Sequence, residues 1–183
     1  MKTRRGFTLV ETAVGVLLAA LLLGIGFRLL SSGMRSSRQG FEVLTNLQAG
    51  TLLLSRIEAD LQRARAVNAQ PAGLRIEVVD DVRASGPVIG VVTYQETPTR
   101  KGLGRKKTGG RGPDEDHALF PEFEVRQDGN VPMFTEVLLA EGKYGVLVHL
   151  QVTGGSETRR YEKLVFCGND PRNFTVPGWQ GER

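Results

Sequence analysis

The sequence predicts an α+β fold, in which a long N-terminal helix packs with its second half on a mostly antiparallel β-sheet head. Three patterns support this prediction. Residues 12–27 are apolar without a charge or a proline, residues 41–66 carry apolar side chains at helical spacing, and from Leu74 onward the apolar spacing shortens towards two. The chain of 183 residues is long enough for one domain with accessory segments.

The first segment has the length and composition of a membrane-spanning helix. From Phe7 to Phe27 it covers about 21 residues, or roughly 31 Å of helix, which is close to the hydrocarbon thickness of a bilayer. Residues 1–6 are short and basic, with Lys2, Arg4 and Arg5. The positive-inside rule then places the N-terminus in the cytoplasm and the C-terminal bulk outside. We therefore expect a leader at residues 1–6 and a transmembrane helix at residues 7–30.

Glu11 separates three interpretations of this segment: a secretory signal peptide, a plain membrane anchor and a processed filament-forming helix. The apolar core is longer than that of a signal peptide, and Ser31-Ser32-Gly33 lacks a clean small-x-small cleavage pattern. A plain anchor does not explain a carboxylate within an apolar segment, where it is costly without a partner. Taken alone, Glu11 also fits a residue that snorkels to the interface and is neutralised by protonation.

The residues Gly6-Phe7-Thr8-Leu9-Val10-Glu11 resemble the cleavage and methylation motif of type IV prepilins and type II secretion pseudopilins. The resemblance implies that a prepilin peptidase cuts between Gly6 and Phe7 and that Phe7 is then N-methylated. It also implies that Phe7 and Glu11, the first and fifth mature residues, serve filament assembly. In hydrocarbon the Glu11 carboxylate would seek a cation, which the free amino terminus of a neighbouring subunit would supply.

Residues 31–66 are predicted to form a hinge followed by an amphipathic helix. The serine- and glycine-rich residues 31–40 indicate a hinge or a weak helical stretch. After residue 41 one helical stripe carries Leu44, Leu47, Leu54, Ile57 and Leu61, and we expect this stripe to cover the sheet. Residues 68–73 are expected to end the helix.

Residues 67–183 are predicted to form a β-rich head of about six strands, near residues 74–78, 88–94, 122–126, 133–139, 146–152 and 161–167. Asp128-Gly129-Asn130 predicts a turn that joins the strands at 122–126 and 133–139 into a hairpin. Residues 168–183 are expected to form an irregular tail. Cys167, the single cysteine, can form no intrachain disulfide and is expected to be a small buried side chain.

Residues 97–117 are predicted to form a flexible basic loop. They hold six basic residues and five glycines but one aliphatic residue, Leu103, so they offer little apolar surface to bury. Such a block of cations could contact DNA, anionic lipid or an acidic partner, although no aromatic residues are interleaved for base stacking. Once Lys2, Arg4, Arg5 and these six cations are set aside, the chain carries a net charge of −5. A uniformly basic nucleic-acid-binding domain is therefore excluded, and we expect no nucleic-acid partner.

No catalytic constellation stands out, and we expect a protein that is not an enzyme and has no catalytic residues, metal site or cofactor. His117 and His149 are too far apart for a histidine-based site, and His149 is expected on a strand face with Leu147 and Gln151. Residues 114–117, Asp-Glu-Asp-His, could hold a divalent cation but are more typical of a solvated charge run.

The resemblance extends, through residues 54–61 and the late hairpin, to the J-type minor pseudopilin of type II secretion or the W-type minor pilin. It implies a single-pass inner-membrane protein whose head lies in the periplasm and which joins a pseudopilus after assembly. The expected partners are the prepilin peptidase, the inner membrane and other pilin-like subunits in a hetero-oligomeric filament tip. Two alternatives stay open: a minor pilin of a type IV pilus used in adhesion, motility or DNA uptake, and a non-polymerising membrane-anchored periplasmic binding module.

Overall fold

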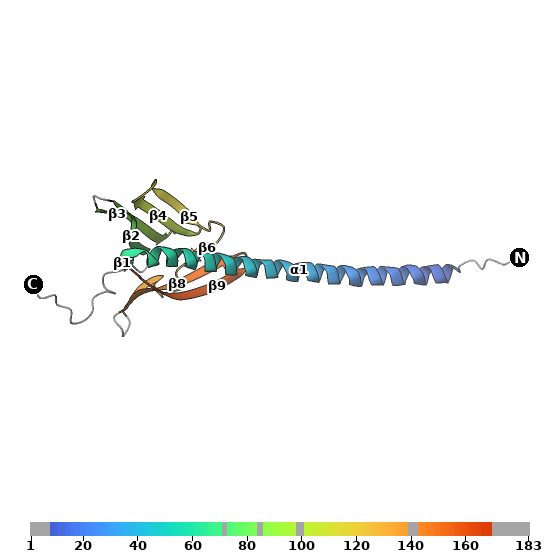
Figure 1. Ribbon diagram of the computed structural model, residues 1–183. Coiled ribbons are helices and arrows are strands. Elements are labelled where there is room, and N and C mark those ends of the chain that lie inside the picture. The colour runs from blue at the N-terminus through green and yellow to red at the C-terminus, as the bar shows by residue number, and fades with distance from the viewer. Residues whose placement is uncertain (1–7, 71–72, 84–85, 98–100, 139–142, 170–183) are drawn as a thin grey trace, which may run out of the picture. The chain divides into compact units, whose positions relative to one another are not determined.

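The computed structural model describes residues 8–70, 73–83, 86–97, 101–138 and 143–169. These residues form one long helix, α1 (Leu9–Gln62), followed by nine strands (Figure 1). The strands pair antiparallel throughout, so the predicted α+β layout of a long N-terminal helix followed by an antiparallel sheet is confirmed. The chain divides into two compact units, residues 1–41 and residues 42–183.

The described part of the first unit consists of the N-terminal part of α1. Among the described residues, α1 is the one helix that is long and apolar enough to cross a membrane. Residues 31–40, for which a hinge or a weak helical stretch was expected, are helical, and the helix continues through Gly24 and Gly26. The Ser31 hydroxyl donates to the Arg28 carbonyl at 3.0 Å, so this serine satisfies its own hydrogen bond on the helix.

The helix ends four residues earlier than the sequence predicts. Gln62 is its last residue, and β1 (Ala64–Gln70) follows after Arg63 alone. β1 buries Ala64 and Val67 and pairs Val67 with Ile76, so residues 68–70 belong to a strand rather than to a helix terminus. Ala, Arg and Gln are good helix formers, but pairing with a neighbouring strand outweighs their local preference.

The first sheet has five strands in the order of the sequence, and each strand pairs with the next. They are β1, β2 (Gly73–Arg83), β3 (Gly86–Glu96), β4 (Leu103–Gly109) and β5 (Glu115–Leu119). The last two replace the flexible loop predicted at residues 97–117, and for the described residues that prediction is wrong. Lys106 lies opposite Asp116 and Lys107 opposite Glu115, so the basic strand pairs with an acidic one.

The second sheet is built around β8 (Tyr144–Gly154). β9 (Glu157–Phe166) runs along one edge of β8, while β6 (Glu124–Arg126) and β7 (Phe134–Leu138) pair with successive parts of the other edge. The predicted hairpin between residues 122–126 and 133–139 is therefore wrong, although the turn exists, with Gly129 at φ 59°. A long apolar strand buries Val125 and Phe134 better than these two short strands would bury each other.

The head core lies where the C-terminal part of α1 meets both sheets, which Figure 1 shows on either side of the helix. The helix contributes Leu53, Leu54, Ile57 and Leu61, the first sheet Leu74, Ile76, Val78 and Val92, and the second sheet Val146, Val148, Leu150 and Val152. Leu44 and Leu47, expected in the buried stripe, are 56% and 37% exposed. Asn46, Ala49 and Gly50 are buried instead. Gly50 leaves room for the Tyr161 ring of the second sheet, which an added Cβ would meet.

Candidate functional site

Glu11 lies in the first turn of α1, and Thr8 precedes that turn. The Glu11 backbone N–H donates to Thr8 Oγ1 at 3.3 Å, and the Thr12 hydroxyl donates to the Leu9 carbonyl at 2.9 Å. Thr8 is thus the N-cap and Glu11 the third helical residue, the order typical of a capping box. A carboxylate here interacts favourably with the positive end of the helix dipole. Gly6 and Phe7, the predicted cleavage and methylation residues, lie outside the described residues.

The helix surface that follows Glu11 is apolar and uncovered. Leu9 is 85% exposed and Phe27 is 73% exposed, and the leucines between them are exposed as well. Gly15 and Gly24 have no atom of the described residues within 4 Å of where a Cβ would stand. A helix that is apolar all round needs lipid or other helices to cover it, and small residues allow close helix contact.

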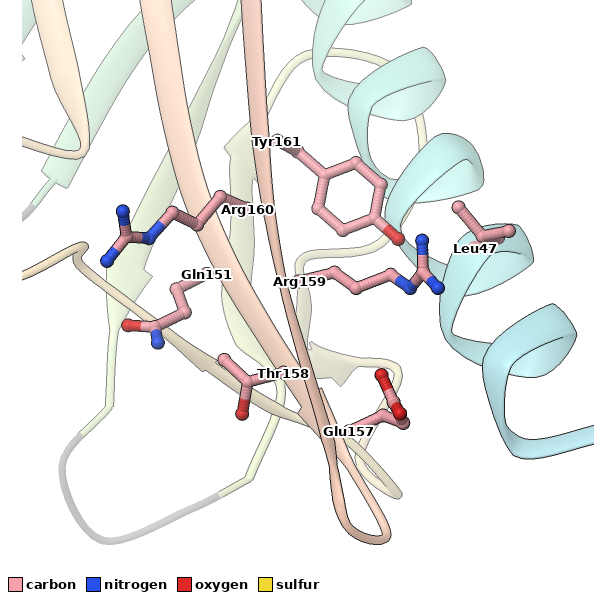
Figure 2. A pocket seen from close by; sticks show the side chains of 7 residues that line it. All are labelled: Leu47, Gln151, Glu157, Thr158, Arg159, Arg160 and Tyr161. Atoms are coloured by element: carbon pink, nitrogen blue, oxygen red, sulfur yellow. The ribbon is translucent and has the colours of Figure 1, made fainter. Parts of the chain in front are cut away.

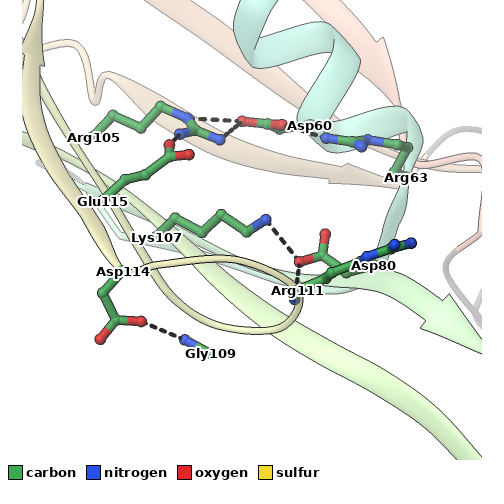
Figure 3. A network of polar contacts seen from close by, with 9 residues as sticks. All are labelled: Asp60, Arg63, Asp80, Arg105, Lys107, Gly109, Arg111, Asp114 and Glu115. Carbon is green, nitrogen blue, oxygen red and sulfur yellow. Dashed lines mark hydrogen bonds and ion pairs between the residues drawn. The ribbon is translucent and has the colours of Figure 1, made fainter.

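A buried ion pair joins the last turn of α1 to the first sheet (Figure 3). Asp60 Oδ2 accepts from the Tyr94 hydroxyl at 2.6 Å and from Arg105 Nε and Nη2 at 3.1 Å each, while Oδ1 accepts from Arg63 Nη2 at 3.0 Å. Arg105 Nη1 also lies 2.7 Å from Glu115 Oε2. Both oxygens of the Asp60 carboxylate therefore accept hydrogen bonds.

The Asp60 carboxylate shifts the pKa values of Tyr94 and Arg105. Burial raises the pKa of Tyr94, and the adjacent Asp60 carboxylate raises it further. Burial lowers the pKa of Arg105, but the Asp60 carboxylate and the Tyr94 hydroxyl outweigh burial and raise it above its ordinary value. The hydrogen bonds and the ion pair of Asp60 fix the last turn of α1 to the first sheet.

A second branch of the network holds the turn between β4 and β5. Asp80 Oδ2 lies 2.7 Å from Lys107 Nζ and accepts from the Arg111 backbone N–H at 3.1 Å. Asp114 accepts from the Gly109 backbone N–H at 2.9 Å, so the acidic run that could have held a cation caps a turn. Three cations of the predicted basic loop, Arg105, Lys107 and Arg111, thus take part in contacts within the head.

The β8–β9 turn packs on the helix where the second unit begins. Asn46 Nδ2 donates to the carbonyls of Gly154 and Glu157 at 3.1 and 3.2 Å, and the Tyr161 hydroxyl donates to the Asn46 carbonyl at 2.8 Å. A Cβ added at Gly50 would stand 2.2 Å from the Tyr161 ring. This contact was not predicted from the sequence, although an asparagine within an apolar stripe is a signal for it.

The remaining chemically active side chains are dispersed. Cys167 is buried, as predicted, and His149 lies on the β8 face that carries Leu147 and Gln151, also as predicted. His149 Nδ1 is 3.9 Å from Glu162 Oε2, and His117 lies on β5. Within the described residues, no group of three or more His, Cys, Asp or Glu side chains is placed to hold a metal ion.

Comparisons of the chain with protein-family models, with curated proteins and with solved structures give no match in any of the three. A function for the chain must therefore be inferred from the N-terminal motif and from the fold.

Proposed function

We propose that this chain is a pilin-like structural subunit, a minor pseudopilin of a type II secretion system that assembles into or caps a periplasmic pseudopilus. One observation carries the proposal: the Gly6–Glu11 motif leads directly into an uncovered apolar helix, with Glu11 in its first turn. The long helix followed by an antiparallel head is compatible with a pilin-like shape.

The helix start gives the motif a physical role. A chain cut after Gly6 would carry its new amino terminus four residues before Glu11. Before assembly, the apolar helix would hold the subunit in the inner membrane with its head in the periplasm. In a filament, pairing of the Glu11 carboxylate with a neighbour's amino terminus would set the register between subunits.

Mass spectrometry of the mature N-terminus tests the processing step. The chain would be co-expressed with a prepilin peptidase, and the mature form is expected to begin at N-methylated Phe7. Gly6→Leu is expected to leave Met1 in place, because a side chain at this position obstructs the peptidase site. A wild-type chain that keeps Met1, or that starts near Gly33, would contradict the proposal.

A substitution at Glu11 tests assembly separately from processing. Glu11→Ala is expected to be cleaved normally but to enter filaments poorly, because the neighbouring amino terminus loses its counter-charge. Thr12→Ala, one residue along the same turn, serves as the matched control and keeps the charge. Unchanged incorporation of Glu11→Ala would refute the charge-pairing account.

The same motif belongs to type IV prepilins, so a minor pilin of a type IV pilus is the second candidate. Cross-linking in cells that carry both a type II secretion system and a type IV pilus distinguishes the two candidates. The captured pilin-like partners belong to one system or to the other. A chain that captures no pilin-like partner would instead be a non-polymerising membrane-anchored module.

A further inference from the structure

Among the residues that the structure describes, one edge of β9 is open. Its other edge pairs with β8 along the full length Glu157–Phe166, and no other described strand pairs with β9. The Cys167 N–H donates to the Tyr144 carbonyl at 3.2 Å, so the odd-numbered residues of β9 are the ones that hydrogen-bond to β8. By the alternation of such ladders, Thr158, Arg160 and Glu162 turn their backbone N–H and C=O groups away from β8. These groups form an unpaired edge, which is a template for a further strand.

A hollow lies over this edge (Figure 2). Figure 2 shows β9 edge-on, with Thr158 and Arg160 on one side of the strand and Arg159 and Tyr161 on the other. Leu47 of α1 forms the wall beyond Arg159 and Tyr161. Because side chains from both faces of β9 line the hollow, it reaches around the edge of the strand, where a further strand would bind.

Arg159 and Leu47 indicate the chemistry of an occupant; the lining also holds Glu157, and its Arg160 is already paired with Asp128 at 3.1 Å. Arg159 Nε is buried and has no hydrogen-bond partner among the described residues. A buried donor without an acceptor is destabilising, so a carboxylate that enters the hollow would satisfy it with a charge-assisted hydrogen bond. The Tyr161 hydroxyl is already committed to the Asn46 carbonyl, and Leu47 is an apolar side chain that is 37% exposed.

We infer that the open edge of β9 is a docking site for an extended, acidic segment of a partner polypeptide. The segment adds a strand through main-chain hydrogen bonds, places a carboxylate on the Arg159 guanidinium and lays an apolar side chain on Leu47. This inference goes beyond the proposed filament role, because it does not depend on cleavage at Gly6.

A second copy of this chain fits the edge poorly. In a symmetric antiparallel pair centred on Arg159 or on Arg160, arginine would face arginine. Centred on Tyr161, the pair would place Arg159 opposite Lys163, although it would also place Arg160 opposite Glu162. Like charges directly opposite each other destabilise a sheet. A strand that presents a carboxylate to Arg159 avoids the arginine–arginine pairs of the first two registers and therefore fits the edge better than a second copy.

Fluorescence anisotropy with the full chain in detergent tests the inference. The probe is a short labelled peptide that alternates valine with glutamate, and the comparison peptides replace glutamate with glutamine or with lysine. A fourth peptide keeps glutamate but is N-methylated on alternate backbone nitrogens, which blocks strand pairing. We expect the glutamate peptide to bind at least about tenfold more tightly than the other three.

Two variants locate the site. Arg159→Glu is expected to weaken binding of the glutamate peptide at least about tenfold, whereas Arg75→Glu, an exposed arginine on β2, leaves it unchanged. Thr158→Pro removes an outward N–H without breaking the β8–β9 ladder and is expected to weaken binding too. Thermal melting shows whether Thr158→Pro is folded. If this variant does not fold, binding of the N-methylated peptide shows whether main-chain hydrogen bonds contribute to binding.

Several results would overturn the inference. The first is that the glutamate peptide does not bind at about 1 mM. The second is that the N-methylated peptide binds as tightly as the unmethylated glutamate peptide. The third is that Arg159→Glu binds the glutamate peptide as tightly as the wild type does. Self-association of the chain that Thr158→Pro abolishes would show that a second copy occupies the edge instead.

Discussion

Replacing Asp60 by leucine should destabilise the head more than its single charge suggests. The Asp60 carboxylate is fully buried and accepts hydrogen bonds from Tyr94, Arg105 and Arg63. Asp60→Leu keeps a side chain of similar size but leaves the Arg105 guanidinium charged in a site where it is 2% exposed.

The structure sets the size of the effect. Removing one partner of a buried ion pair costs about 3–5 kcal/mol, because the other charge stays buried and unpaired. Glu115 still contacts Arg105 at 2.7 Å, but its side chain is 43% exposed, so it compensates only in part. We therefore expect a loss near the low end, about 3 kcal/mol, or roughly 10 °C in melting temperature for a unit of this size.

Urea unfolding of the detergent-solubilised chain, followed by circular dichroism, measures this loss. The double variant Asp60→Leu/Arg105→Met is expected to return to within about 1 kcal/mol of the wild type, since no charge stays unpaired in the core. Arg126→Met, at an exposed arginine with ion pairs to Glu96 and Glu124, is the matched control and should cost less than about 1 kcal/mol.

Two outcomes would refute this reasoning. A cost below about 1 kcal/mol for Asp60→Leu would show that the site relaxes or admits water. A double variant as unstable as the single one would show that the loss comes from packing or from Tyr94 rather than from the stranded charge.

Three further predictions concern pH and close packing. Burial raises the pKa of Asp80, but hydrogen bonds from the Lys107 side chain and the Arg111 backbone N–H outweigh burial and hold the pKa below the ordinary 3.8. The ionised Asp80 therefore contributes to the free energy of unfolding above pH 3.8, and this contribution is lost as acid protonates the carboxylate. In Asp80→Asn the free energy of unfolding should depend less steeply on pH below about pH 4. The pKa of Tyr94 is raised, by burial and then by its carboxylate neighbour, so its contribution persists below the ordinary pKa of 10.0 and is lost in stronger alkali; Tyr94→Phe should abolish this loss in alkaline melting curves. Gly50→Ala should lower the melting temperature because the new Cβ meets the Tyr161 ring, whereas Gly40→Ala, with open space, should stabilise the helix by up to about 1 kcal/mol.

The helix and the later strands were predictable because each has its own periodicity. Alternation identifies β8, where Val146, Val148, Leu150 and Val152 are all buried, and this pattern needs no partner to be visible. β1 was not predictable in the same way. Its alanines and arginine suit a helix, and only pairing with β2, a tertiary contact, makes it a strand.

The polar contacts were hidden because their partners are distant in sequence. Arg105 and Lys107 were placed in a flexible basic loop, yet the carboxylates that pair with them, Asp60 and Asp80, lie on α1 and β2. Composition shows that residues 97–117 are charged, but it does not show that the acidic residues at 114–116 return opposite the basic ones. The predictions for Gly6 and Phe7 rest on the motif itself and are tested by chemistry rather than by geometry.

The strict order of strands in the first sheet has a consequence for folding. Because each of β1 to β5 pairs with its neighbour in sequence, the sheet has low contact order and grows by adding one hairpin at a time. A chain that emerges amino-terminus first completes this sheet on an already synthesised helix before β6 exists, whereas β6 and β7 must wait for β8. Pulse-labelled hydrogen exchange during refolding should therefore protect β2 and β3 before β6.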